Sequence, residues 1–168
     1  MHHAFAHSTA SEDLYRDDRD RARYLQLLGY VVARVGWRCL AYCLMDNHVH
    51  LLVQTPHANL GPGFQLLHGL YAQSFNKRHR RSGHVFKARF GSVLVKSDAQ
   101  LLQVARYIAR NPVEAGLCDR PDAWGWCSHA ATIRASGPPW LDVAGLLGYF
   151  GADGGDPRRR YDAFVAIR

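Results

Sequence analysis

The sequence predicts an α+β fold in which helices pack against an antiparallel sheet. Hydrophobic residues recur at helical spacing in three segments, apolar strand-like runs lie between them, and a turn signal joins two of these runs directly. This order, with a strand hairpin between helices, is typical of an α+β sandwich. The 168 residues suit one domain with an ordinary hydrophobic core.

Local signals place each element along the chain. Asp17 and the acids after it form an N-cap and a first helical turn, and Gly36 is a typical helix stop. Pro112 closes a later helix, because proline disfavours helical geometry in the preceding residue. The expected elements are a strand over residues 4–9, a helix over 18–35, strands over 37–45 and 48–55 joined by Asp46-Asn47, a loop over 56–63, a second helix ending at Ser82-Gly83, a strand over 89–97, a third helix over 99–110, a helix over 141–150, a flexible segment over 151–155 and a mobile basic tail from Pro157.

Two histidines stand out in an otherwise apolar run from Leu44 to Val53. Alternate side chains of a strand project from one face, so His48 and His50 are expected side by side. Two imidazoles on one rigid strand form half of a metal site. Two ligands do not complete a site, however, and hydrogen-bonded, partly buried strand histidines are the alternative interpretation.

Positive charge is concentrated in the middle of the chain. The formal net charge is +7, and neither Asp nor Glu occurs between Asn47 and Lys96. Such a segment can be a solvated surface. Beside a candidate metal site it favours a polyphosphate partner, and nucleic acid is the leading candidate. The candidate phosphate contacts are Lys77, Arg78, Arg80, Arg81, Lys87 and Arg89.

Other features narrow the class of protein. No apolar run reaches the ~20 residues of a membrane span. The N-terminus has no basic and apolar pattern of a secretion signal, so we expect a cytoplasmic, nucleoid-associated protein. The four cysteines lack a Cys-x-x-Cys motif and are expected to be reduced, with a Cys39–Cys43 metal pair as a minor alternative.

The third predicted helix carries a polar stripe that includes Tyr107 and Asn111. These residues are four apart and share a helix face. An amide oxygen suits Mg²⁺ or Mn²⁺, and a tyrosine hydroxyl is a covalent nucleophile. The alternative is that Tyr107 packs as a half-buried aromatic and Asn111 caps the helix. Tyr71 is a competing nucleophile, although its apolar neighbours explain it by packing.

Five motifs occur in a defined order along the chain. They are Tyr42-Cys-Leu-Met-Asp-Asn-His-Val-His-Leu-Leu-Val53, Tyr71-Ala-Gln-Ser-Phe-Asn76, Arg81-Ser-Gly-His-Val-Phe86 with Arg89-Phe90, Arg106-Tyr-Ile-Ala-Arg-Asn-Pro-Val-Glu-Ala-Gly116, and Trp124-Gly-Trp-Cys-Ser128. Together they resemble the single-tyrosine HUH transposases, and within them the REP-associated tyrosine transposases related to insertion-sequence-200-like enzymes. The chain departs from the family pattern at His7-Ser8, Ala88 and Cys127-Ser128, none of which removes a catalytic group.

The resemblance implies a ferredoxin-like fold over residues 1–130. Residues 131–168 lie beyond the matched motifs and are expected to form a short helical C-terminal extension with a basic tail. The resemblance also implies that His48, His50 and Asn111 bind Mg²⁺ or Mn²⁺ and that Tyr107 is the nucleophile, in agreement with the helical spacing. The implied activity is nicking and rejoining of hairpin-forming single-stranded DNA through a 5′-phosphotyrosine, without a nucleotide cofactor.

Several alternatives stay open at this point. The chain can be a monomer or a homodimer. It can also be a domesticated, non-catalytic nucleic-acid-binding domain. A zinc hydrolase fits less well, because the segment from Asn47 to Ser97 offers no acidic base.

Overall fold

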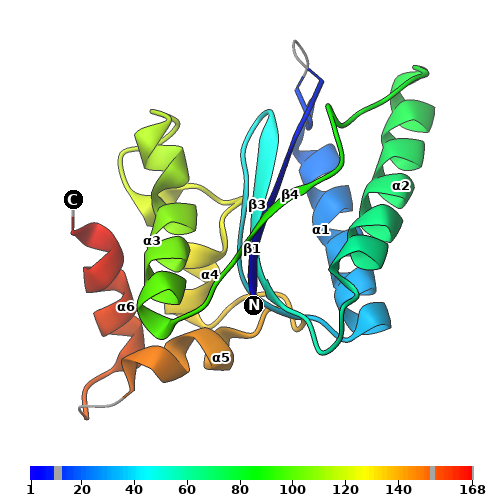
Figure 1. Cartoon of the computed structure of the whole chain (residues 1–168). Coiled ribbons are helices and arrows are strands. Elements are labelled where there is room, and N and C mark those ends of the chain that lie inside the picture. Colours follow the sequence, from blue (N-terminus) through cyan, green and yellow to red (C-terminus); the bar gives the residue numbers. More distant parts are fainter. Residues whose placement is uncertain (10–12, 152–153, 168) are drawn as a thin grey trace.

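The computed structural model describes residues 1–9, 13–151 and 154–167. Four antiparallel strands form one sheet in the order β2-β3-β1-β4: β1 (His2–His7), β2 (Arg38–Leu44), β3 (His48–Gln54) and β4 (Gly91–Leu94). Helices α1 (Asp18–Val35) and α2 (Leu60–His79) cover one face, and α3 (Asp98–Glu114) lies on the other (Figure 1). The βαββαβ order with this arrangement confirms the predicted α+β, ferredoxin-like fold.

Helix α1 forms where the local signals predicted. The Asp17 carboxylate accepts hydrogen bonds from the backbone N–H groups of Arg19 and Asp20, which satisfies two free donors of the first turn. Gly36 ends the helix with φ of 72°, a left-handed conformation that glycine adopts without steric cost. The apolar side of the helix packs into a core between the sheet and α2.

The expected loop over 56–63 is present only over residues 56–59, because α2 already begins at Leu60. Pro62 lies in the first turn, where its missing N–H leaves no helical bond unmade. Gly63 allows the Trp37 ring to lie directly against the helix, since a Cβ there would be 2.1 Å from Trp37 Cζ2. The Trp37 indole N–H also donates to Asn59 Oδ1 at 3.0 Å, so a tertiary contact holds this first turn.

Helix α3 also extends further than expected and continues past Pro112 to Glu114. Proline cannot donate to the carbonyl of Ile108 one turn earlier. In the structure the Cys127 thiol approaches that carbonyl, with Sγ 3.8 Å from the oxygen. The lost helical bond is therefore partly replaced by a contact from a distant residue.

Strands β1 and β4 differ from the expected ranges for the same reason. Strand β1 covers residues 2–7 instead of 4–9, because it pairs with β3 from His2↔Val53 to His7↔His48. Strand β4 covers 91–94 instead of 89–97, since it pairs only with the first residues of β1, from His2↔Leu94 to Phe5↔Gly91. Both ranges are set by the pairing partner and not by the strand's own sequence.

The C-terminal region packs on the α3 side of the sheet (Figure 1). The predicted helix over 141–150 is present as two short pieces, and the predicted mobile tail is wrong, because a helix forms there. Tyr161 and Val165 on this last helix are buried. The elements are 3₁₀ turn η1 (Pro121–Ala123), α4 (Ser128–Arg134), α5 (Val143–Leu147), 3₁₀ turn η2 (Gly148–Phe150) and α6 (Pro157–Ala166).

The domain boundary at residue 130 stays a prediction, and residues 152–153 of the expected flexible segment lie outside the described residues. Among the residues that the structure describes, no helix combines the length and apolar character that crossing a membrane requires.

Candidate functional site

Strand pairing places a group of histidines on the α3 side of the sheet. In the β1–β3 register, Phe5 lies opposite His50 and His7 opposite His48. Because strand side chains alternate between faces, His3 on β1 shares this face with the other two histidines and with His7. The sequence therefore contributes histidines from two neighbouring strands, and not from β3 alone.

Helix α3 brings Tyr107 and Asn111 to the same place. The side chains of β1, β3 and α3 enclose a hollow of about 520 Å³. Its lining residues are His3, Phe5, His7, His48, His50, Tyr107, Asn111, Glu114 and Ala115. The four predicted site residues thus converge around one space, although their chemical roles stay predictions.

His48 lies between two amide side chains. Its Nδ1 is 2.7 Å from Asn47 Oδ1, and its Nε2 is 3.2 Å from Asn111 Oδ1. A neutral imidazole carries one proton, which can serve only one of these two oxygens. With the proton on Nδ1, the lone pairs of Nε2 and of Asn111 Oδ1 face each other, and a cation would satisfy both.

His50 is more deeply buried and is also incompletely paired. Its Nδ1 is 3.1 Å from His3 Nε2, whereas its Nε2 is buried and has no hydrogen-bond partner within the described chain. A buried polar atom without a partner is costly unless a ligand takes it up. This orphaned nitrogen and the paired lone pairs at His48 fit a bound divalent cation.

Burial keeps these imidazoles neutral. Burial, together with the smaller effects of the neighbouring His48, His3 and His7, lowers the pKa of His50 to about 3. Burial also lowers the pKa of His48, although the nearby Asn111 oxygen opposes the shift because it can accept a hydrogen bond from the protonated ring. Neutral imidazole is the form that binds a metal ion, so the nitrogen lone pairs are available at neutral pH.

Tyr107 stands at the accessible side of the hollow. Its side chain is 43% exposed, and its ring contacts His50 edge-on at a centroid distance of 5.3 Å. The competing Tyr71 is 1% exposed and donates its hydroxyl to the Leu14 carbonyl at 2.6 Å. Only Tyr107 of these two is accessible to a macromolecular substrate.

The donor set differs from a zinc site. Within the described ranges, no group of three or more His, Cys, Asp or Glu residues is placed to hold a metal ion. The set found here contains two imidazoles and one amide oxygen. The amide oxygen is a harder ligand than the nitrogen and sulfur atoms that bind structural zinc. Cys39 and Cys43 are free, buried thiols, and burial raises the pKa of both.

Sequence reasoning missed His3, His7 and Glu114. The alternation His3-x-Phe5-x-His7 was visible, but the predicted strand began at residue 4 and so excluded His3. Glu114 was missed because the helix was expected to end before Pro112.

The hollow between β1, β3 and α3 is called the histidine hollow below. None of the six predicted basic residues lines it. Arg78 forms salt bridges with Asp17 and Asp20 and thereby ties α2 to the start of α1. Arg81 lies over the Phe75 ring at 5.6 Å. Lys77 and Arg80 are exposed at the C-terminal end of α2.

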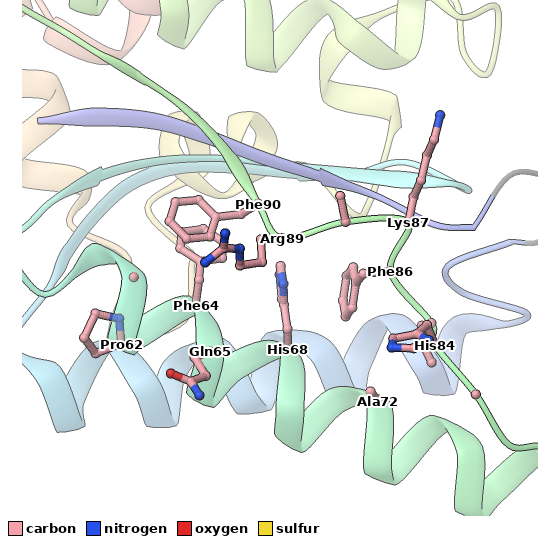
Figure 2. Close-up of a pocket in the computed structure, with 14 residues that line it drawn as sticks. Pro62, Phe64, Gln65, His68, Ala72, His84, Phe86, Lys87, Arg89 and Phe90 are labelled. Atoms are coloured by element: carbon pink, nitrogen blue, oxygen red, sulfur yellow. The ribbon is translucent and has the colours of Figure 1, made fainter.

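Lys87 and Arg89 line a second hollow, of about 870 Å³, between α2 and residues 83–90 (Figure 2). Two stacked aromatic pairs hold this segment on the helix: Phe64 with Phe90 at 4.3 Å and His68 with Phe86 at 3.8 Å. The Lys87 side chain extends away from these rings (Figure 2). Both cations are exposed, so they are accessible to a phosphate backbone.

Comparison with known proteins is consistent with this geometry. The family model "Transposase IS200 like" matches residues 2–111. A Haemophilus influenzae protein, whose name assigns it provisionally to the REP-associated tyrosine transposases, is 29% identical over 108 residues, which are 57% of this chain and 61% of that protein. The chain thus spans less than two thirds of this relative.

Two solved structures are similar to this chain to different degrees. A REP-associated tyrosine transposase bound to a REP hairpin superposes with a TM-score of 0.60 at 14% identity, covering 82% of each chain. A structure from Deinococcus radiodurans R1, whose title assigns it provisionally to the transposases, has a TM-score of 0.47 at 18% identity, covering 64% of this chain and 88% of that chain. Since the family model covers well over half of the sequence, the chain belongs to the IS200-like transposase family.

Proposed function

We propose that this chain nicks and rejoins hairpin-forming single-stranded DNA, with Tyr107 as the nucleophile and a divalent cation as cofactor. The observation that carries the proposal is the convergence of an exposed phenol, an amide oxygen and two neutral imidazoles around one hollow. The REP hairpin bound to a protein of the same fold supports the choice of DNA.

His48 Nε2, His50 Nε2 and Asn111 Oδ1 are the atoms that would hold Mg²⁺ or Mn²⁺. When bound there, the cation would withdraw charge from the scissile phosphate and orient it for in-line attack. The rigid pairing of β1 with β3 and the packing of α3 over them fix these donors in place without the cation.

Tyr107 carries out the covalent step. Its hydroxyl oxygen attacks the phosphorus, the bond from phosphorus to the 3′ oxygen breaks, and the phenol proton is lost while the leaving 3′ oxygen gains one. The product is a 5′-phosphotyrosine with a free 3′-hydroxyl strand. Attack by a 3′-hydroxyl on this linkage restores the phosphodiester and the phenol, so no nucleotide is consumed.

Five cations of the basic segment are proposed to hold the DNA backbone. Lys87 and Arg89 beside the second hollow, and Lys77, Arg80 and Arg81 near the end of α2, contribute positive charge that neither Asp nor Glu offsets in the same segment. Arg78 is left out of this surface because its guanidinium is engaged by Asp17 and Asp20.

The test is formation of a covalent protein–DNA adduct. We would incubate the chain with single strands that contain a hairpin and Mn²⁺, and analyse the products by denaturing electrophoresis and mass spectrometry. Tyr107→Phe is expected to abolish the adduct and to keep hairpin binding. Tyr30→Phe is the matched control, because Tyr30 is also exposed but lies on α1, on the opposite face of the sheet.

Adduct formation by Tyr107→Phe at the parent level would remove Tyr107 from the mechanism. Salt-dependent hairpin binding with no adduct from the parent chain under any cation would instead identify a non-catalytic DNA-binding protein.

A further inference from the structure

His3 is one of the residues of the histidine hollow to which neither the sequence nor the proposed chemistry assigns a role. It lies on β1, and its ring contacts His50 at a centroid distance of 5.2 Å and Tyr107 at 5.7 Å. Its Nε2 lies 3.1 Å from His50 Nδ1. His3 therefore lies against both a candidate ligand and the candidate nucleophile.

The hydrogen bond between His3 and His50 has two proton arrangements. In one, His3 Nε2–H donates to His50 Nδ1, and the His50 proton then sits on Nε2. In the other, His50 Nδ1–H donates to His3 Nε2, and His50 Nε2 keeps a bare lone pair. In the first arrangement His50 Nε2 can only donate a hydrogen bond. In the second it offers a lone pair that can bind a cation.

The surroundings of His50 Nε2 distinguish these arrangements. This nitrogen is buried and has no hydrogen-bond partner among the described residues. A proton there would be a buried donor with nothing to accept it. His50 lines the same hollow as His48 and Asn111, so a lone pair on its Nε2 can be taken up by a cation held there.

We propose that His3 is a positioning residue that accepts a hydrogen bond from His50 Nδ1–H and thereby holds His50 in the tautomer whose Nε2 is free to bind the divalent cation. This inference rests on the metal site of the proposed function. A metal-binding imidazole usually donates its other N–H to a carboxylate, carbonyl or water. Here a second imidazole, fixed by the β1–β3 pairing, takes that place.

Two substitutions separate the hydrogen bond from the bulk of the ring. Gln at position 3 can present a carbonyl oxygen to His50 Nδ1–H, whereas Leu fills space but accepts nothing. His2→Leu is the matched control, because His2 lies on the same strand but projects from the opposite face. Thermal unfolding of each full-length variant would show that all are folded.

The first readout is Mn²⁺ binding without DNA, measured by titration calorimetry. His3→Leu is expected to weaken Mn²⁺ binding about 10- to 100-fold, the usual effect of removing a partner of a ligating histidine. His3→Gln is expected to recover most of the affinity, and His2→Leu to match the parent. Equal Mn²⁺ affinity of His3→Leu and the parent would overturn the proposal.

The second readout is the protonation of the His50 ring nitrogens, measured by ¹⁵N NMR on the cation-free chain. The parent and His3→Gln are expected to carry the proton on Nδ1, and His3→Leu to lose this preference. A parent chain with the proton on Nε2 would overturn the role of His3. A parent chain with the proton on Nδ1 that does not bind Mn²⁺ would contradict the metal site instead, so the two failures are distinguishable.

Discussion

His68 makes the stability of this protein sensitive to acid. The ring lies on α2, stacked on Phe86, and burial lowers its pKa from 6.5 to about 3. Because the folded pKa is depressed, the unfolded chain binds a proton more readily below pH 6.5. The contribution of neutral His68 to stability is therefore present above pH 6.5 and is lost as the pH falls towards 3.

The size of this effect follows from the pKa values. Between pH 6.5 and pH 5 the unfolded chain becomes protonated at this site while the folded one does not. Each pH unit of that interval corresponds to about 1.4 kcal/mol, so His68 is expected to cost the fold about 2 kcal/mol at pH 5 relative to pH 7. Phenylalanine is a suitable replacement, because it keeps an aromatic ring stacked on Phe86 and has no titratable group.

The assay is urea unfolding of the parent and of His68→Phe at pH 7 and pH 5, followed by circular dichroism. The variant is expected to lose about 2 kcal/mol less unfolding free energy over this interval than the parent. His57→Gln, at an exposed position between β3 and α2, is the control for removing an imidazole that is not buried. An identical pH dependence in His68→Phe and the parent would refute the reasoning.

Two further predictions concern packing and DNA binding. Gly63→Ala places a Cβ 2.1 Å from the Trp37 ring and is expected to lower the unfolding free energy by about 1–3 kcal/mol; an unchanged urea midpoint would contradict the close contact. The double substitution Lys87→Gln with Arg89→Gln is expected to weaken hairpin binding and to reduce the slope of log affinity against log salt by roughly 1.4 to 1.8. Arg34→Gln, exposed in the last turn of α1, should leave that slope unchanged, and an equal loss in both variants would argue against a localised phosphate surface.

Local sequence determined the parts of the fold that lie within one element. Asp17 caps the start of α1 and Gly36 ends it, each through interactions with residues at most four positions away. The side-by-side placement of His48 and His50 follows from the two-residue period of a strand, and that of Tyr107 and Asn111 from the helical period. These pairs could be predicted because the backbone geometry of each element fixes them.

Tertiary structure decided which of these faces meet and where several elements end. Helix α2 starts at Leu60 because Trp37 packs against Gly63, and α3 passes Pro112 where Cys127 approaches the freed carbonyl. These contacts join residues that are far apart in the sequence, so no local pattern encodes them.

The composition of the site and the ion pairs of the basic segment likewise depend on contacts between distant residues. His3 joins the histidine hollow through the register of β1 against β3, and Arg78 is engaged by acids 58 and 61 residues away. The sequence by itself determined which chemical groups each element presents. Only the packing of α3 over paired strands determined that they share one space, because strand register and helix docking depend on contacts between distant segments.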